Sequence, residues 1–117
     1  MSRCSRSISR GNLRNILAAL SFVLLPTGAG ATDFTAGVVM EKMDGKERHT
    51  YLAGVIEGLA YSRYVKDGKK TEGMKCIYDW FYKKNGTHEK IYSAFRRFND
   101  YLPGAVVAAM VEKECGA

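Results

Sequence analysis

The chain has 117 residues, 46% of them hydrophobic, and a formal net charge of +6. This length suffices for one domain with one hydrophobic core. Four of the 18 basic residues lie in the first 31 positions, whereas all 12 acidic residues follow them, so residues 32–117 carry only +2. This near balance argues against nucleic-acid binding, which usually shows a strongly basic face.

Residues 1–31 contain the three parts of a secretory signal peptide in their usual order. Arginines without acids come first, the apolar run 16–25 follows, and the small residues Ala29 and Ala31 provide a cleavage site. The apolar run is about half of the ~20 residues that a membrane span needs. We therefore expect cleavage after Ala31 and a domain over 32–117 that is periplasmic or secreted, without membrane attachment.

Two cysteines, Cys76 and Cys115, remain once the predicted signal peptide is removed with Cys4. In an oxidising compartment, an even pair in a small domain predicts a disulfide. A nucleophilic or metal-binding thiol is the alternative. It has little support, because CxxC spacing is absent and the chain has only two histidines.

Helical periodicity predicts an all-α domain, a small bundle of four to five helices closed by one disulfide. We expect a short helix over 36–43 and a long one over 46–65, with apolar residues at spacings of three and four. Further helices are expected over 71–83, 88–101 and 103–114, the last of them beginning at Pro103. No segment shows the strict alternation that is typical of a half-buried strand.

Three local patterns carry more detailed expectations. Gly54 and Gly58 lie four residues apart in the long helix, where each costs about 1 kcal/mol relative to alanine. We expect them to permit the close approach of another helix, in the core or at a dimer interface. Thr87 is expected to cap the next helix by accepting a backbone N–H bond. Phe98 and Leu102 are expected to point inward.

The sequence offers no catalytic constellation, so we do not expect an enzyme, a metal or a cofactor. His49 and His88 are far apart in the sequence, lack acids at ligand spacing, and are interpreted as surface residues. Some of the many tyrosines should be exposed, and tyrosine together with arginine favours protein contacts. The group expected to bind a partner consists of Tyr82, Lys83, Lys84, Arg96 and Arg97.

The segment 51–59, YLAGVIEGL, resembles the YLxGxxxG helix of the Rap1a/Tai family of immunity proteins. The resemblance extends over residues 50–115. It includes Cys76 after a polar loop, aromatic residues before Pro103, and a small-residue helix that runs into Cys115.

This resemblance implies a small periplasmic all-α protein. It would bind and occlude a cell-wall amidase toxin delivered by type VI secretion, with a homodimer as a second expectation. The resemblance assigns an inhibitory role to no particular residue of this sequence. Two other classes stay open: a periplasmic stress or chaperone-type protein similar to the HdeA group, and a secreted effector that acts on a host.

Overall fold

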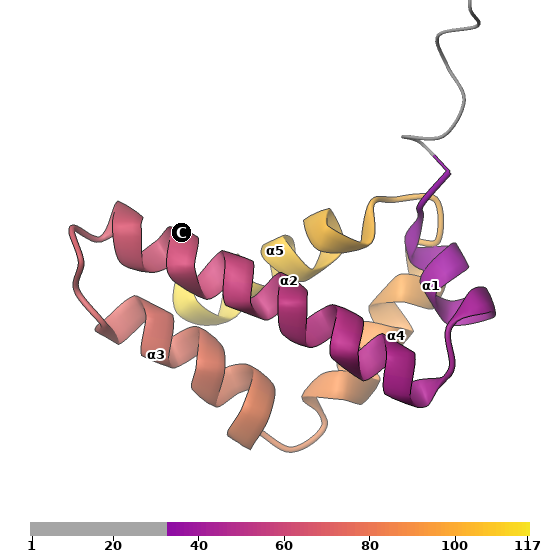
Figure 1. The fold of residues 1–117 in the computed structure, drawn as a ribbon, viewed down its shortest axis with the longest axis horizontal. Coiled ribbons are helices and arrows are strands. Elements are labelled where there is room, and N and C mark those ends of the chain that lie inside the picture. Colours follow the sequence, from indigo (N-terminus) through magenta and orange to yellow (C-terminus); the bar gives the residue numbers. More distant parts are fainter. Residues whose placement is uncertain (1–32) are drawn as a thin grey trace, which may run out of the picture.

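The computed structural model describes residues 33–117 (Figure 1). The predicted signal peptide and its cleavage residues, Ala29 and Ala31, lie outside the described residues. All regular elements of the described part are helices and none is a strand, which confirms the expected all-α class. None of its helices is long and apolar enough to cross a membrane. The elements in chain order are α1 (Ala36–Lys42), α2 (Gly45–Lys66), α3 (Glu72–Tyr78), the π-helix η1 (Asp79–Lys83), α4 (Thr87–Arg97) and α5 (Pro103–Cys115).

Side-chain caps fix where the first two helices begin. The Thr35 hydroxyl accepts a bond from the Val38 N–H at the start of α1. At the start of α2, the Asp44 carboxylate accepts from the Glu47 N–H, and the Glu47 carboxylate accepts from the Asp44 N–H. This reciprocal capping box explains why α1 and α2 are separated by only two residues.

The predicted helix over 71–83 is divided into α3 and η1. The Lys84 N–H donates to the Asp79 carbonyl, a spacing of five residues that widens this last turn. Gly86 then has a φ of 81°, a left-handed conformation that suits glycine, and the chain turns into α4. The π-helix directs Trp80 and Phe81 into the core, where both are buried.

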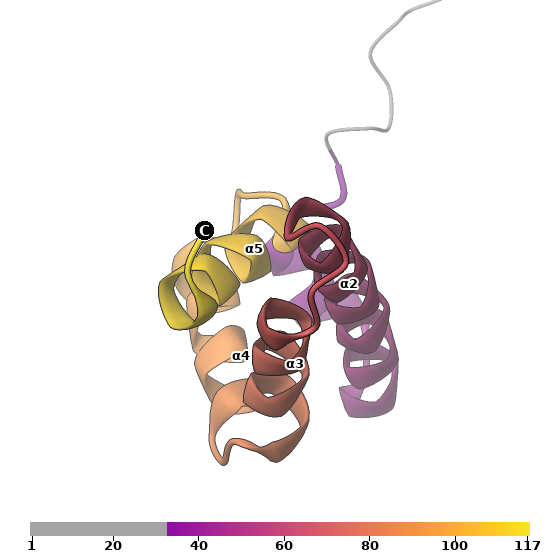
Figure 2. The same cartoon turned by 90° about the vertical axis from the view of Figure 1, so that its left-hand side faces the viewer.

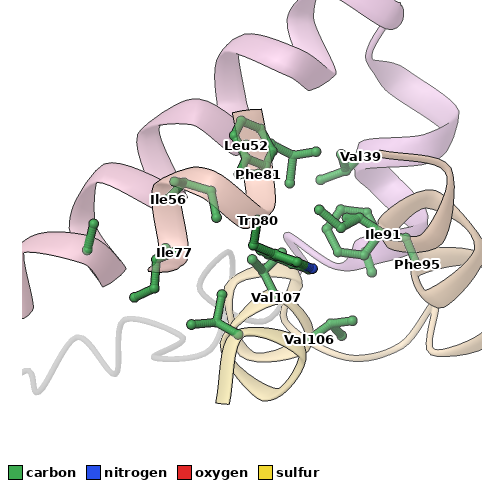
Figure 3. Packing of buried hydrophobic residues seen from close by; sticks show 13 residues of the cluster. Val39, Leu52, Ile56, Ile77, Trp80, Phe81, Ile91, Phe95, Val106 and Val107 are labelled. Carbon is green, nitrogen blue, oxygen red and sulfur yellow. The ribbon is translucent and has the colours of Figure 1, made fainter. Parts of the chain in front are cut away.

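One hydrophobic core holds the helices together. Figure 3 shows side chains from α1, α2, η1, α4 and α5 converging around Trp80 and Phe81. Figure 2 shows α3 lying between α2 and the pair formed by α4 and α5. The buried hydrophobic residues are Ala36, Val39, Leu52, Ile56, Ala60, Ile77, Trp80, Phe81, Ile91, Phe95, Val106, Val107 and Val111.

The predicted disulfide is confirmed. Cys76 of α3 is bonded to Cys115 at the end of α5, across a sequence separation of 39 residues. Arg63 reinforces this junction from α2, because its Nη1 donates to the carbonyls of Cys115 and Gly116. Its Nε donates to the Asp67 carboxylate at 2.8 Å. The C-terminus of the chain is therefore held by a covalent bond and by a charge-assisted hydrogen-bond network.

The prediction that the third helix reaches Tyr101, with Phe98 and Leu102 inward, is wrong. The helix α4 ends at Arg97, and Phe98 and Leu102 are 41% and 55% exposed. The helix gives way to a turn, in which the Tyr101 N–H donates to the Phe98 carbonyl and other carbonyls meet the start of α1. There the Ala36 N–H donates to the Tyr101 carbonyl at 2.8 Å, and the next N–H of α1 donates to a carbonyl of the same turn.

Candidate protein-binding surface

The structure divides the predicted partner-binding group between two places. Lys83 Nζ lies 2.8 Å from an Asp79 carboxylate oxygen, and Lys84 pairs with Glu114 of α5. These two lysines and the half-exposed Tyr82 lie at the end of η1. Arg96 and Arg97 lie on the last turn of α4, about 15 Å further along at 1.5 Å per residue. The five residues therefore do not form one continuous patch.

A different surface has the character of a binding site. The helices α4 and α5 border an apolar groove of about 440 Å³. Val106 is the buried side chain of its lining. Three alanines also line it, and their small side chains leave the groove wide. Exposed apolar grooves of this kind mark interaction sites more often than isolated exposed apolar residues do. The groove is lined by Ala94, Phe98, Tyr101, Ala105, Val106, Ala109, Met110 and Lys113.

Aromatic rings form the rim of the groove at the turn between α4 and α5. Phe98 and Tyr101 meet edge to face, with ring centroids 5.7 Å apart. The Arg97 guanidinium lies 5.4 Å from the centre of the Phe98 ring. Arg97 is thus the one member of the predicted group that contacts the rim. The helical spacing of apolar residues continues through Phe98, and for that reason it predicted a core position for this residue.

Within residues 33–117, Lys113 is the only charged side chain that lines the groove. No carboxylate lies within 4.0 Å of its amine among residues 33–117, although four other basic side chains of this part are paired. An ammonium group at the edge of an apolar surface is available to a partner's carboxylate. The groove therefore combines apolar contact area with one free positive charge.

The structure brings the two histidines together, and only His49 fits the interpretation as a surface residue, since it is exposed whereas His88 is half-buried. The rings of His49 on α2 and His88 on α4 stack with centroids 5.2 Å apart, and both lie against Phe81. His88 Nε2 is buried and has no hydrogen-bond partner in the described chain. Burial, followed by the neighbouring His49, lowers the pKa of His88, while Glu89 acts in the opposite direction. Sequence spacing could not reveal a pair that only the packing of α2 against α4 creates.

This histidine pair has no third ligand around it. No group of three or more histidine, cysteine, aspartate or glutamate side chains in residues 33–117 is placed to hold a metal ion. Metal sites in proteins typically use three or four such ligands. The structure shows this pair as two stacked rings in contact with Phe81.

Gly54 and Gly58 do not face another helix of the same chain. Both are exposed, and a Cβ placed at either position would meet no heavy atom within 4 Å. The expected close approach inside the core is therefore wrong, whereas contact with a second copy stays a prediction. The crowded glycine is instead Gly73 of α3. There a Cβ would lie 2.5 Å from the Asp67 carboxylate and 2.6 Å from Arg63 Nε.

The fold and this surface define a class: an all-α, disulfide-closed bundle with an open apolar groove. Comparison with known proteins adds no relative, since no family model, curated protein or solved structure matches the chain.

Proposed function

We propose that the chain is a small exported protein that binds another protein and blocks it by covering its surface. The observation that carries this proposal is the apolar groove between α4 and α5 with its rim of Phe98, Tyr101 and Arg97. Tyrosine and arginine around an apolar centre match the composition of the residues that dominate protein interfaces. The disulfide and the single core support a rigid scaffold, which lowers the entropic cost of binding.

The resemblance to the Rap1a/Tai family supports one kind of partner, a cell-wall amidase toxin delivered by type VI secretion. In this proposal the chain acts in the periplasm as an immunity-type inhibitor. It occludes the enzyme stoichiometrically and catalyses nothing itself. The disulfide is consistent with an oxidising compartment.

The proposal is tested by capturing partners from periplasmic extracts with the immobilised oxidised chain. Extracts from the source cells and from rival cells are used, and each capture is repeated with reductant. We expect a peptidoglycan hydrolase in the bound fraction, whose activity falls in proportion to the chain added. Absence of any cell-wall hydrolase from all of these extracts would contradict the immunity function.

A second candidate, a periplasmic stress or chaperone-type protein, is supported by the pair His49 and His88. The two imidazoles repel each other when both are protonated, and His88 is buried against Phe81, so acid weakens the packing of α2 on α4. Such loosening would expose core side chains to unfolding clients. The test is suppression of client aggregation at acidic and neutral pH. Activity that appears only in acid, and that is lost when both histidines are replaced by glutamine, would favour this candidate.

A further inference from the structure

We infer that the groove between α4 and α5 accepts one amphipathic helix of a partner protein, whose acidic residue docks on Lys113. This inference rests on the proposed function and deepens it by naming the kind of segment that is bound. It depends on the shape of the groove, on the size of its lining side chains and on the distribution of charge around it.

The shape of the groove favours a helix over a small molecule. Five of its eight lining residues are exposed, so it is a shallow trough along the surface rather than an enclosed cavity. Small-molecule sites usually bury most of the ligand, which an open trough does not do. A helix, in contrast, inserts only one apolar face into such a groove and leaves its other face in water.

The lining side chains leave room for the apolar residues of such a helix. Ala94 of α4 faces the groove together with Ala105 and Ala109 of α5, and each of these alanines projects only one methyl group into it. Larger side chains of a partner can occupy the spaces between Phe98 and Met110. Methionine adapts its shape to different partners, because it is unbranched and flexible.

The charge around the groove is positive at the end formed by Lys113. On α4, Lys90 precedes Ala94 by one helical turn and therefore lies on the same face, towards this end. Neither lysine has a carboxylate within 4.0 Å in residues 33–117. At the opposite end, the exposed Arg96 and Arg97 are followed by one exposed acid of the turn, Asp100. An acidic residue of the partner is therefore favoured at the Lys113 end.

Two other occupants are less consistent with these observations. An anionic membrane surface attracts clusters of several basic residues, whereas residues 32–117 carry only +2. A second copy would have to present an acidic apolar helix of its own. The helix α1 of such a copy would offer only one acid. Its helix α5 would have to leave the groove that it lines in its own chain. Both occupants are outcomes of the experiment below.

The probe is a fluorescein-labelled synthetic helix with leucines along one face and two glutamates at one end of that face. A second peptide carries lysines in place of the glutamates. Binding to the oxidised chain is measured by fluorescence anisotropy. We expect the glutamate peptide to bind at least about tenfold more tightly than the lysine peptide, a ratio that corresponds to about 1.4 kcal/mol.

Two groove variants are compared with one matched control. Ala109→Glu places a carboxylate in the groove and should abolish binding of the glutamate peptide. Lys113→Glu should reverse the preference, so that the lysine peptide binds better. Thr50→Glu adds the same charge at an exposed position of α2 outside the groove, and it should bind like the unaltered chain. Circular dichroism of each variant confirms that the helices are retained.

Equal binding of the glutamate peptide to the unaltered chain and to Ala109→Glu would overturn the inference. So would binding to anionic phospholipid vesicles in preference to the peptide. Self-association that Ala109→Glu relieves would also overturn it, because the groove would then hold a second copy. If the captured hydrolase still binds Ala109→Glu, the inference fails while the proposed function stands. If the peptide binds but no hydrolase is captured, the proposed function fails while the groove assignment stands.

Discussion

His49 and His88 form a stacked pair across the contact between α2 and α4, with ring centroids 5.2 Å apart. His49 is exposed, whereas His88 lies partly buried against Phe81 of η1 with its Nε2 unpaired. A neutral imidazole fits this place, while an imidazolium loses hydration and meets a second ionisable ring. We therefore expect the pair to make the stability of the fold depend on pH.

Stability should fall as the pH decreases from neutral. The pKa of His88 is lowered by burial and by His49, so the unfolded chain binds this proton more readily than the folded chain. The loss begins as the pH falls through about 6.5, the usual pKa of histidine, and ends below the lowered folded pKa. Glu89 of α4 opposes the shift, and Phe81 does not titrate.

Urea unfolding between pH 7.5 and pH 5 measures this dependence, with His88→Gln as the test variant. We expect the variant to lose less stability than the unaltered chain over this range. His49→Gln should reduce the loss partly, since burial of His88 remains. An identical pH profile for His88→Gln and the unaltered chain would refute the role of the pair.

Breaking the disulfide should destabilise the domain strongly. Closing a loop across the 39-residue separation of Cys76 and Cys115 contributes about 4 kcal/mol in the chain-entropy model. Unfolding in urea with and without reductant measures this contribution. The double variant Cys76→Ser, Cys115→Ser, which cannot form the disulfide, should be as unstable as the reduced chain. A reduced chain as stable as the oxidised one would show that the core alone holds the fold.

The glycines should respond to alanine in opposite directions. Gly73→Ala must displace Arg63 or Asp67, because the new Cβ would lie within 2.6 Å of atoms of both, and we expect a loss of about 2 kcal/mol. Gly54→Ala and Gly58→Ala meet open space in an exposed part of α2, and each should stabilise by about 1 kcal/mol.

Thermal unfolding at one protein concentration ranks these three variants. Sedimentation of Gly54→Ala tests the remaining prediction for these glycines, since loss of a dimer would show that they face a second copy. Destabilisation of a monomeric Gly54→Ala chain would contradict the open environment seen in the structure.

Thr87 stabilises the junction between η1 and α4 in a way that differs from the predicted cap. It is 1% exposed, it is the first residue of α4, and its hydroxyl lies 2.8 Å from the Trp80 carbonyl and 3.1 Å from the Lys84 carbonyl. The residue before α4 is Gly86, which has no side chain to cap with. The expectation that Thr87 accepts a backbone N–H is therefore wrong, because buried carbonyls of the preceding turn compete for its hydroxyl.

Thr87→Val keeps the shape of this side chain and removes its hydrogen bonds. We expect a loss of about 1–3 kcal/mol in the free energy of unfolding, because the Trp80 carbonyl loses a buried donor. Thr87→Ser, which retains the hydroxyl, should lose less than Thr87→Val. A Thr87→Val variant as stable as the unaltered chain, together with a loss for Thr87→Ser, would show that the methyl group matters and the hydrogen bonds do not.

Local sequence signals predicted most of the fold. The expected helix over 46–65 corresponds to α2, and Pro103 begins α5 as expected. The two cysteines pair as expected. Periodicity and the position of a proline can be recognised within one segment of the sequence, and the number of cysteines follows from the composition. The end of α4 was missed, because apolar spacing continues through Phe98 into a turn whose carbonyls bond to α1, far away in the sequence.

The candidate site could be predicted only in part. Tyr82 and the two lysines after it were grouped with Arg96 and Arg97 by residue type, but the length of α4 separates them. The groove is formed by Met110 of α5 together with Phe98 of the turn that follows α4, and helical spacing alone assigned Phe98 to the core. The proximity of His49 and His88 likewise exists only after packing. Residue types indicated which side chains favour protein contacts, whereas only the tertiary structure shows which of them lie together on one surface.

The central claim is that the chain blocks a partner enzyme by covering it through the groove between α4 and α5. Titration of the captured hydrolase with the oxidised chain tests this claim most directly, with peptidoglycan cleavage as the readout and Ala109→Glu as the comparison. We predict that activity falls linearly to a plateau near zero at a fixed ratio of chain to enzyme, and that Ala109→Glu leaves cleavage unchanged. Full cleavage at saturating unaltered chain would contradict the claim.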